Sequence, residues 1–378
     1  MSSAHLRISF VRRGHSSSGG AESYLKRLAA GVCALGHEAT LVTTAEWPRE
    51  EWPFGAIHQL KGESPMQFAE QFEALRSRVG GDVVMSLERV WSCDVYRAGD
   101  GVHRAWLDQR AKLSSPLRRV AHALNRKHLA TLRLEQALFG RGSAQRVIAN
   151  STMVKSEIRA LYGYPAAQID VVHNGVPVEL FKPTAERRTA SRAKLGLAAD
   201  DIAVLFVGSG WERKGLRFAI EAVEACANPR MRLLVAGRGS EGGYRSAAAR
   251  FLGVVSDLPS LYAAADIFLL PTIYDPFSNA SLEALAAGVP VVTTRANGFS
   301  EILSDAVHGS IIEAPDDVAS ITAALRLWSE RSRREEARPR LLELAGDFDI
   351  SANVARTLEI LLQAAASADS TSGKMRKI

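Results

Sequence analysis

The amino-acid sequence predicts an α/β protein built from two doubly wound, Rossmann-like domains. Short apolar segments alternate with segments of helical periodicity along most of the chain, which is the pattern of parallel sheets with crossover helices. This alternation starts a second time after a loop around Pro183, so we expect two sheets rather than one. With 378 residues the chain is long enough for two domains that each bury a core.

The first domain is expected to cover residues 1–173. An apolar strand at residues 6–11 is followed by a glycine loop, a helix up to Gly36 and a second strand at residues 38–44, which together make a βαβ unit. Further short strands, each ending in a turn or a polar residue, are expected at residues 82–87, 94–99, 146–151 and 170–175.

The second domain is expected to cover residues 174–348. Its strands are predicted at residues 203–208, 232–237, 251–253, 267–272, 290–294 and 309–314. Its helices are predicted at residues 214–227, at residues 259–265 and after Asn279. Beyond this domain, residues 349–366 should form a terminal helix, whereas the small, polar and charged residues 367–378 are expected to be disordered.

The composition, with 47% hydrophobic and 23% charged residues, is typical of a soluble globular protein. No apolar run reaches the roughly 18 to 20 residues that span a bilayer, and the N-terminal apolar stretch of about six residues is too short for a secretory signal. We therefore expect a cytoplasmic protein. Cys33, Cys93 and Cys226 are widely separated in apolar surroundings, which favours buried thiols over disulfides or a zinc site.

Positive charge is concentrated between Arg97 and Arg146. This segment holds eleven Lys or Arg residues against three acids, although the whole chain carries a net charge of only +6. Such a concentration indicates an anionic partner, which could be a membrane surface, a phosphorylated acceptor or nucleic acid. Within the segment, Ser115 and Pro116 are expected to start a basic helix that runs to residue 139. That helix is either an ordinary domain helix with a solvated basic face or a site of peripheral attachment to anionic lipid.

Two acids, Asp275 and Glu283, lie eight residues apart across a turn that opens a predicted helix. Pro276 marks the turn, and the segment after Asn279 is helix-forming. The N-terminus of a helix favours an anion such as a diphosphate, and acids on either side of it could hold the hydroxyls of sugars. The alternative is a surface turn with one acid before the helix and one on its face.

Two loops between a strand and a helix could bind phosphate. Arg213 and Lys214 follow the strand that ends at Gly208, where two cations could stabilise a departing nucleoside diphosphate without a metal. Solvated charges at a helix start are the alternative, which is disfavoured because cations there oppose the helix dipole. Gly19 and Gly20 allow backbone amides to approach a phosphate or a sugar, and their loop is not a G-x-G-x-x-G dinucleotide fingerprint.

Asp100 and His103 lie in the turn after the strand predicted at residues 94–99. Ligands bind at the carboxyl edge of parallel sheets, so Asp100 could orient an acceptor hydroxyl and His103 could contact the donor sugar or phosphate. Ordinary surface positions are the alternative for both. The Asp-x-Asp sequence at Asp347 and Asp349 directly precedes the terminal helix, where Asp349 is a better helix cap than a metal ligand, so no metal is expected.

These motifs, in this order, resemble those of family 4 of the retaining nucleotide-sugar glycosyltransferases. Asp275 stands where the E-x7-E signature of that family has its first Glu, and Glu283 matches the second. Arg213 and Lys214 match the Arg-Lys-Gly pattern of the lipopolysaccharide core glucosyltransferase branch, and Arg213 is expected to substitute for a family Arg whose place Ser209 fills. The resemblance implies the GT-B fold, in which two Rossmann-like domains face each other across a cleft and the terminal helix returns to the first domain.

The resemblance also implies where the donor binds. In the family, the Gly-Gly pair lies beside the donor phosphate and the acceptor, and backbone groups just after the F-x-G strand contact the nucleobase. With the strand glycine and the helix start, the expected donor-binding residues are Gly19, Gly20, Gly208, Val254, Val255, Ser256, Asn279 and Ala280.

The function implied by the resemblance is transfer of a hexose from a nucleotide diphosphate sugar to an anionic acceptor. A UDP-hexose and the lipopolysaccharide inner core are the favoured pair, at the inner face of the cytoplasmic membrane, with neither a cofactor nor a nucleic-acid partner. Alternatives are a family 4 hexosyl- or mannosyltransferase acting on another glycan, lipid or small molecule, and a non-catalytic nucleotide-sugar or glycan binding protein, which the missing first Glu would suit. A GT-B epimerase is less favoured, because the further acids and histidines that it needs are not identifiable.

Overall fold

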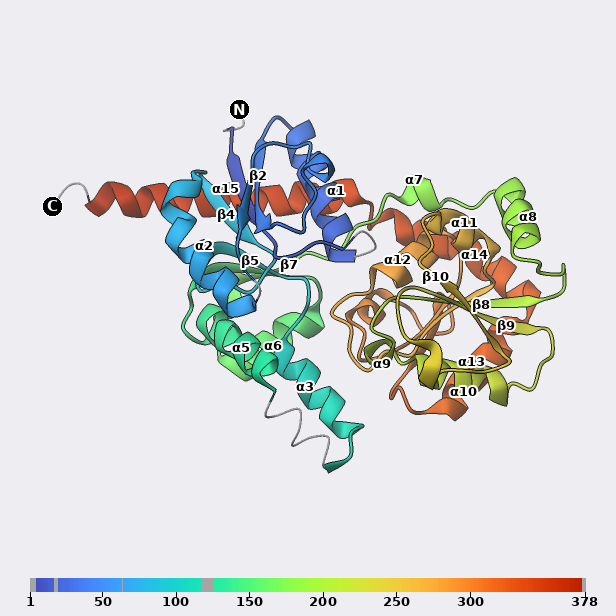
Figure 1. Ribbon diagram of the computed structural model, residues 1–378. Helices are drawn as coiled ribbons and strands as arrows, with labels where there is room; N and C mark the ends of the chain where they lie inside the picture. The colour runs from blue at the N-terminus through green and yellow to red at the C-terminus, as the bar shows by residue number, and fades with distance from the viewer. Residues whose placement is uncertain (1–4, 17–19, 63, 117–124, 376–378) are drawn as a thin grey trace. The chain divides into compact units, whose positions relative to one another are not determined.

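The computed structural model describes residues 5–16, 20–62, 64–116 and 125–375. The described chain divides into two compact units, each an α/β layer structure (Figure 1). Unit 1 contains the residues up to His173 together with those from Ser351 onward, and unit 2 contains Asn174–Ile350. The terminal segment therefore belongs to unit 1, although unit 2 precedes it in the sequence.

Unit 1 is built on a seven-stranded parallel sheet with the strand order β3-β2-β1-β4-β5-β6-β7. The strands are β1 (Arg7–Val11), β2 (Glu38–Thr44), β3 (Ile57–Leu60), β4 (Val83–Ser86), β5 (Cys93–Ala98), β6 (Ala144–Ala149) and β7 (Ile169–Val171). The sequence pattern does not predict β3, because this short edge strand contains His58 and Gln59 and lacks an apolar run.

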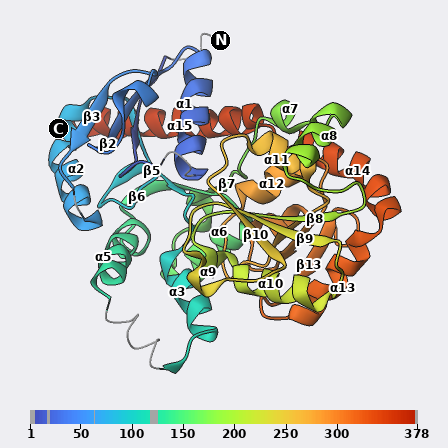
Figure 2. The ribbon, with the colours of Figure 1, turned by 45° about the vertical axis from the view of Figure 1, so that its right-hand side comes forward.

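The helices of unit 1 cover both faces of this sheet (Figures 1 and 2). They are α1 (Gly20–Ala34), η1 (Arg49–Glu51), α2 (Pro65–Val79), α3 (His103–Lys112), α5 (Arg126–Glu135), the π-helical turn η2 (Gln136–Gly140), α6 (Thr152–Tyr162), η3 (Ala166–Gln168) and α15 (Ile350–Met375). Helix α15 packs closely against α1. A Cβ on Gly31 would lie only 2.6 Å from Val354 Cγ2, and the Tyr24 hydroxyl donates to Asn353 Oδ1 at 2.9 Å.

Unit 2 is built on a six-stranded parallel sheet with the order β10-β9-β8-β11-β12-β13. The strands are β8 (Ile202–Val207), β9 (Met231–Ala236), β10 (Ala249–Gly253), β11 (Ile267–Leu270), β12 (Val291–Thr294) and β13 (Gly309–Ile312). Its helices are α7 (Val178–Phe181), α8 (Ala185–Lys194), α9 (Trp211–Lys214), α10 (Leu216–Ala225), η4 (Glu241–Gly243), α11 (Leu258–Ala264), α12 (Asn279–Ala286), η5 (Gly298–Ile302), α13 (Val318–Ser329) and α14 (Arg331–Gly346). Helices α10 and α13 cover one face of the sheet, and α11 and α12 cover the other (Figure 2).

The structure corrects three of the predicted helices. The helix expected at residues 214–227 is divided at Gly215, whose φ of +76° separates α9 from α10. A Cβ at Gly215 would lie 1.8 Å from the Pro271 carbonyl oxygen, so this turn requires glycine. The basic helix expected from Ser115 to residue 139 does not pass through Asn125, which is extended and whose side chain accepts a hydrogen bond from Lys127 N as the cap of α5.

The third correction concerns the end of the chain. Helix α15 runs to Met375, so it continues through most of the segment 367–378 that we expected to be disordered. This segment has a polar composition, but it contains no proline and continues an alanine-rich run, both of which allow a helix to propagate.

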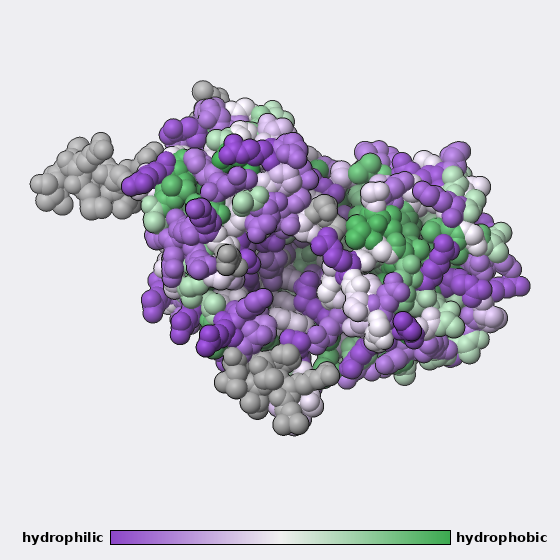
Figure 3. Space-filling view, in the orientation of Figure 1, coloured by the Kyte–Doolittle hydropathy of each residue, from purple (hydrophilic) through white to green (hydrophobic). Residues whose placement is uncertain are grey.

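Polar side chains predominate on the face of unit 1 shown in Figure 3, whereas on unit 2 they surround an apolar area. None of the helices in the described part of the chain is both long and apolar enough to cross a bilayer. All three cysteines are free thiols, and Cys33 is only partly buried, in contrast to Cys93 and Cys226.

Candidate functional site

A buried polar constellation of unit 2 lies at the carboxyl edge of its sheet. The loop after β8 leads through Gly208 into α9. Lys214, the last residue of α9, forms an ion pair with Asp275 Oδ2. Both side chains are almost fully buried, with 12% of Lys214 and 6% of Asp275 exposed. Burial lowers the pKa of Lys214, the Asp275 carboxylate opposes that shift, and nearby Arg213 adds to it. The two buried charges are therefore stable only because each neutralises the other.

Backbone contacts hold both partners of this ion pair in place. The stem of Lys214 lies over Gly208, where an added Cβ would meet Lys214 Cε at 3.3 Å. Asp275 is fixed from the other side, because its N–H donates to the Ala296 carbonyl at 2.9 Å and its carbonyl accepts from Gly298 N at 2.8 Å. A side chain at position 208 would therefore displace the lysine.

Glu283 is the second acid, one turn into α12. It is 7% exposed, and its Oε2 lies 3.1 Å from the Tyr262 hydroxyl, which also lies 2.9 Å from the Ala280 carbonyl. Burial, and then the Glu283 carboxylate, raises the pKa of Tyr262 well above its usual value, so the hydroxyl remains a donor. Asp275 and Glu283 thus lie before and after the N-terminus of α12, as their spacing predicts.

The start of α12 is rigidly built. Ser278 caps the helix by accepting from Ser281 N at 3.2 Å, and the buried Asn297 amide accepts from Ser278 N at 3.2 Å. Asn174 Nδ2 donates to Asn279 Oδ1 at 2.6 Å, so the first residue of the helix is also tied to the start of unit 2. Ala280 follows it in the first turn.

Arg213 lies beside this constellation and contacts the segment after β11. Its Nη1 donates to the Tyr274 carbonyl at 3.2 Å, and its own carbonyl accepts from Ile273 N and Thr272 Oγ1, both at 2.8 Å. The Arg-Lys-Gly turn is therefore joined to the turn that carries Asp275 through both its backbone and a side chain.

The expected nucleobase segment follows β10. Val254 is 54% exposed, which is unusual for an apolar side chain, and Ser256 is also exposed, whereas Val255 is half-buried. Sequence reasoning missed the neighbouring Trp211, which packs with Phe251 at a ring separation of 5.2 Å and donates from Nε1 to the Gly208 carbonyl. A tryptophan between two glycine-rich loops is the signal that could have identified it.

Unit 1 contains a polar pocket of about 270 Å³ that includes Asp100 and His103, two of the site residues expected in that unit. Its other lining residues are Arg12, Arg13, Pro65, Glu88, Arg89, Thr131 and Leu134. The half-exposed Asp100 accepts from Arg12 Nη1 at 3.0 Å, and Arg12 also pairs with Glu22 at 3.2 Å. No motif in the sequence points to these arginines as site residues.

A buried carboxylate, Glu135, organises the wall of this pocket. It is fully inaccessible and accepts hydrogen bonds from His103 N at 2.7 Å and Arg104 N at 3.0 Å, at the start of α3. It also accepts from Arg89 Nε at 3.2 Å and from the Tyr162 hydroxyl at 2.7 Å. Glu135 was missed, and a single acid within a largely apolar stretch is the signal that marks it.

His103 is neutral at physiological pH in this setting. Burial, and then the nearby Arg89, lowers the pKa of His103 to about 4, and its Nε2 lies 3.0 Å from His128 Nδ1. It can therefore contribute a hydrogen bond to a ligand but not a positive charge.

Of the glycine pair, Gly20 is the exposed first residue of α1, and Gly19 lies outside the described residues.

Each unit is a parallel α/β sheet with its candidate site residues at the carboxyl edge, which is the architecture of glycosyltransferases of the GT-B type, and comparison with known proteins agrees. A family model described as Glycosyltransferase Family 4 matches residues 18–180, and one described as Glycosyl transferases group 1 matches residues 201–330. A Burkholderia thailandensis protein named as a probable transglycosylase is 30% identical over 304 residues, covering 79% of each chain. The chain belongs to glycosyltransferase family 4, which confirms the family expected from its motifs.

Other similar proteins match over different spans. A D-inositol 3-phosphate glycosyltransferase 2 of Catenulispora acidiphila is 30% identical over 240 residues, or 58% of this chain and 56% of that one. WaaG, a glycosyltransferase involved in lipopolysaccharide biosynthesis, has a similar structure with a TM-score of 0.79 at 21% identity, covering 94% of this chain and 99% of WaaG. HepE of Anabaena, solved with UDP-glucose, gives a TM-score of 0.70 at 19% identity and covers 97% and 100%. These likenesses confirm the predicted fold.

Proposed function

We propose that this glycosyltransferase moves a hexose from a nucleotide diphosphate sugar, most simply a UDP-hexose, to an anionic acceptor, with retention of configuration and without a metal. The observation that carries the proposal is the buried Lys214–Asp275 pair at the start of α12. A diphosphate placed there would meet the helix N-terminus and the Lys214 cation together, and both stabilise the charge that grows on a leaving diphosphate.

The acids then have separate tasks. We assign Asp275 to the donor hexose hydroxyls and Glu283 to the ribose hydroxyls, with Arg213 as a second cation. In the proposed step, the bond between the sugar C1 and the diphosphate oxygen breaks, and the acceptor oxygen forms a bond to C1 on the same face. The acceptor proton passes to the departing diphosphate oxygen, so the step is balanced without an outside base.

The acceptor is assigned to the pocket of unit 1. Its three arginines, Arg12, Arg13 and Arg89, suit a phosphorylated or carboxylated glycan, and Asp100 offers an acceptor for a substrate hydroxyl. The favoured acceptor is a glycan or glycolipid of the lipopolysaccharide core type, in line with the biosynthetic process of WaaG.

A second candidate acceptor is a small phosphorylated polyol. It is favoured by the relatives named D-inositol 3-phosphate glycosyltransferases and by the pocket volume of about 270 Å³, which is modest for a glycolipid headgroup. Both acceptors would use the same donor site.

The test is a matrix of turnover assays with UDP-, GDP- and ADP-hexoses against a deacylated lipopolysaccharide core fragment and D-inositol 3-phosphate, with and without chelator. We expect turnover with one donor, unaffected by chelator, and an α-linked product from an α-linked donor by NMR. An inverted product or loss of turnover with chelator would contradict the mechanism. Donor binding without turnover on any acceptor would instead favour the nucleotide-sugar binding protein.

We further propose reversible attachment to anionic membrane through the basic segment 97–146. Near an anionic bilayer each Lys or Arg contributes about 1 kcal/mol, and salt weakens the attraction over a Debye length of about 8 Å. Replacing Arg118, Arg119, Arg126 and Lys127 with Gln should weaken sedimentation with phosphatidylglycerol vesicles and spare turnover on a soluble acceptor. The first two of these residues lie outside the described residues. Equal sedimentation of both proteins would contradict the attachment.

A further inference from the structure

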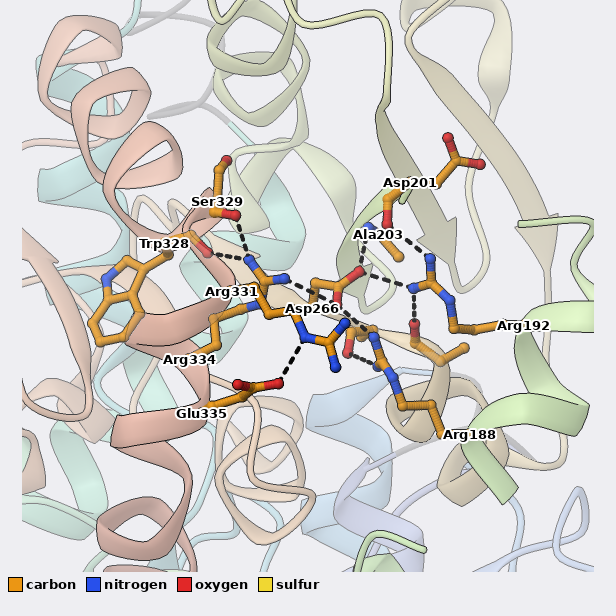
Figure 4. Close-up of polar contacts among 12 residues, drawn as sticks. Arg188, Arg192, Asp201, Ala203, Asp266, Trp328, Ser329, Arg331, Arg334 and Glu335 are labelled. Atoms are coloured by element: carbon orange, nitrogen blue, oxygen red, sulfur yellow. Dashed lines mark hydrogen bonds and ion pairs between the residues drawn. The ribbon is translucent and has the colours of Figure 1, made fainter. Parts of the chain in front are cut away.

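Unit 2 carries a dense arginine cluster at the opposite edge of its sheet from the donor site. Asp266, just before β11, accepts from Arg188 Nη2 at 2.6 Å and Arg192 Nη1 at 2.9 Å, with Arg334 Nη2 at 3.5 Å (Figure 4). Arg188 and Arg192 come from α8, and Arg334 comes from α14. Asp266 also accepts from Ala203 N at 2.8 Å, so a single buried carboxylate joins both helices to the sheet.

The C-termini of two helices offset part of the positive charge of this cluster. Arg188 donates to the Ala263 and Ala265 carbonyls at the end of α11, and Arg334 donates to the Trp328 and Ser329 carbonyls at the end of α13. Each helix C-terminus supplies up to about half a negative charge. The three guanidiniums around Asp266 therefore keep an excess of about one positive charge.

Two further arginines extend the cluster along one face of α14. Arg331, Arg334 and Arg338 are separated by three and four residues, so they share a helix face, and their side chains lean toward the helix N-terminus. Arg331 Nε donates to Glu335 at 2.7 Å. The two terminal nitrogens of Arg331 have no hydrogen-bond partner in the described part of the chain. Arg338 Nε is buried and has no hydrogen-bond partner there either.

The cluster is therefore undercompensated. In the described part of the chain, these five arginines interact with two carboxylates, Asp266 and Glu335, and the C-termini of α11 and α13 offset part of the remaining positive charge. Burial, and then Arg188, lowers the pKa of Arg338, and Glu335 and Asp266 oppose that shift. At the N-terminus of α14 the nearest acid is the cap residue, Glu330, whose side chain makes no capping bond, and the first turn contains no further acid.

We propose that Arg331 and Arg338 bind a phosphate-bearing anion on this face of unit 2, in the positive field of Arg188 and Arg334. Guanidinium groups suit phosphate because their planar donors match its oxygens. Arg331 is 82% exposed, so the anion can approach from solvent, whereas the guanidiniums of Arg188 and Arg334 are held in place by their contacts with Asp266. Glu335 competes for Arg331 and would be displaced when the anion binds.

The first experiment reads individual arginines and is thus independent of the donor site. Phenylglyoxal modification is followed by peptide mass spectrometry in the presence of inorganic pyrophosphate, phosphatidylglycerol vesicles or phosphatidylcholine vesicles. Protection of Arg331 and Arg338 by pyrophosphate identifies a soluble phosphate compound as sufficient, and protection by the anionic vesicles alone identifies a lipid headgroup. Protection by neither, or equal protection by phosphatidylcholine, overturns the proposal.

The second experiment measures affinity for whichever probe protects. Arg331→Gln/Arg338→Gln should weaken binding at this site by at least about tenfold, because charge-assisted hydrogen bonds are lost. Arg333→Gln/Arg340→Gln removes the same charge from another face of α14 and should change affinity much less. Glu335→Gln should tighten binding by removing the competing carboxylate. Equal losses in the two double variants, or unchanged affinity in Glu335→Gln, would refute the site.

Discussion

The Lys214–Asp275 pair allows a structural contribution to be separated from a catalytic one. Lys214→Met leaves the Asp275 carboxylate buried without a cation, and Asp275→Asn leaves the ammonium without an anion. Removing one partner of a buried pair costs about 3–5 kcal/mol of unfolding free energy. The double variant removes both charges, so it should cost clearly less than the sum of the two single changes.

Activity should behave differently from stability. If both groups act on the donor, each single variant loses about 10²- to 10³-fold in kcat, and the double variant stays at least as low. The measurement is a double-mutant cycle of urea midpoints beside kcat on folded protein at a temperature where all variants are native. Arg76→Met/Asp94→Asn, at a partly buried pair of unit 1, is the control that should lose stability and keep kcat. A double variant that recovered kcat would show that the pair only supports the fold, and the site assignment would be wrong.

Three further outcomes are expected. Glu283→Ala should lose about 10²- to 10³-fold in rate, through an increased KM for the donor or a reduced kcat. Tyr262→Phe removes one hydrogen bond to Glu283 and should lose far less. Near-normal kinetics of Glu283→Ala would exclude Glu283 from the donor site. Glu135→Gln should raise the acceptor KM more than the donor KM, because it loosens the start of α3 beside the acceptor pocket, and an unchanged acceptor KM would restrict Glu135 to stability. The folded-state pKa of His103 is about 4, below its ordinary 6.5. The stability that its neutral form contributes is therefore complete above pH 6.5 and is lost as the pH falls toward 4. Over this range the urea midpoint of His103→Gln should fall less than the midpoints of wild type and of the control His58→Gln.

Local patterns predicted much of unit 2. The spacing of Asp275 and Glu283 and the turn between them place the start of α12 correctly, because caps and helix-forming residues act over one or two turns. The division at Gly215 was missed, since its cause is the Pro271 carbonyl, which is distant in sequence. Asn125 shows the converse case, in which a local cap interrupts a periodicity that otherwise favours one helix.

The features of the candidate site that could not be predicted from the sequence depend on contacts between residues that are distant in the chain. Asp275 and Lys214 were predicted as separate donor contacts, but nothing in a single sequence shows that two residues 61 positions apart neutralise each other. The pocket of unit 1 was predicted only through Asp100 and His103, because Arg89 and Glu135 meet across 46 residues. Burial of a charged side chain is a tertiary property, and periodicity alone does not reveal it.

The position of α15 has a consequence for synthesis on the ribosome. Unit 2 is one continuous stretch, Asn174–Ile350, so it can fold as soon as that stretch has emerged. Unit 1 cannot be completed so early, because Gly31 and the Tyr24 hydroxyl contact Val354 and Asn353, which are made only when nearly the whole chain has been translated. The part translated first is thus completed last, and the face of α1 that receives α15 stays uncovered until the final helix has been made.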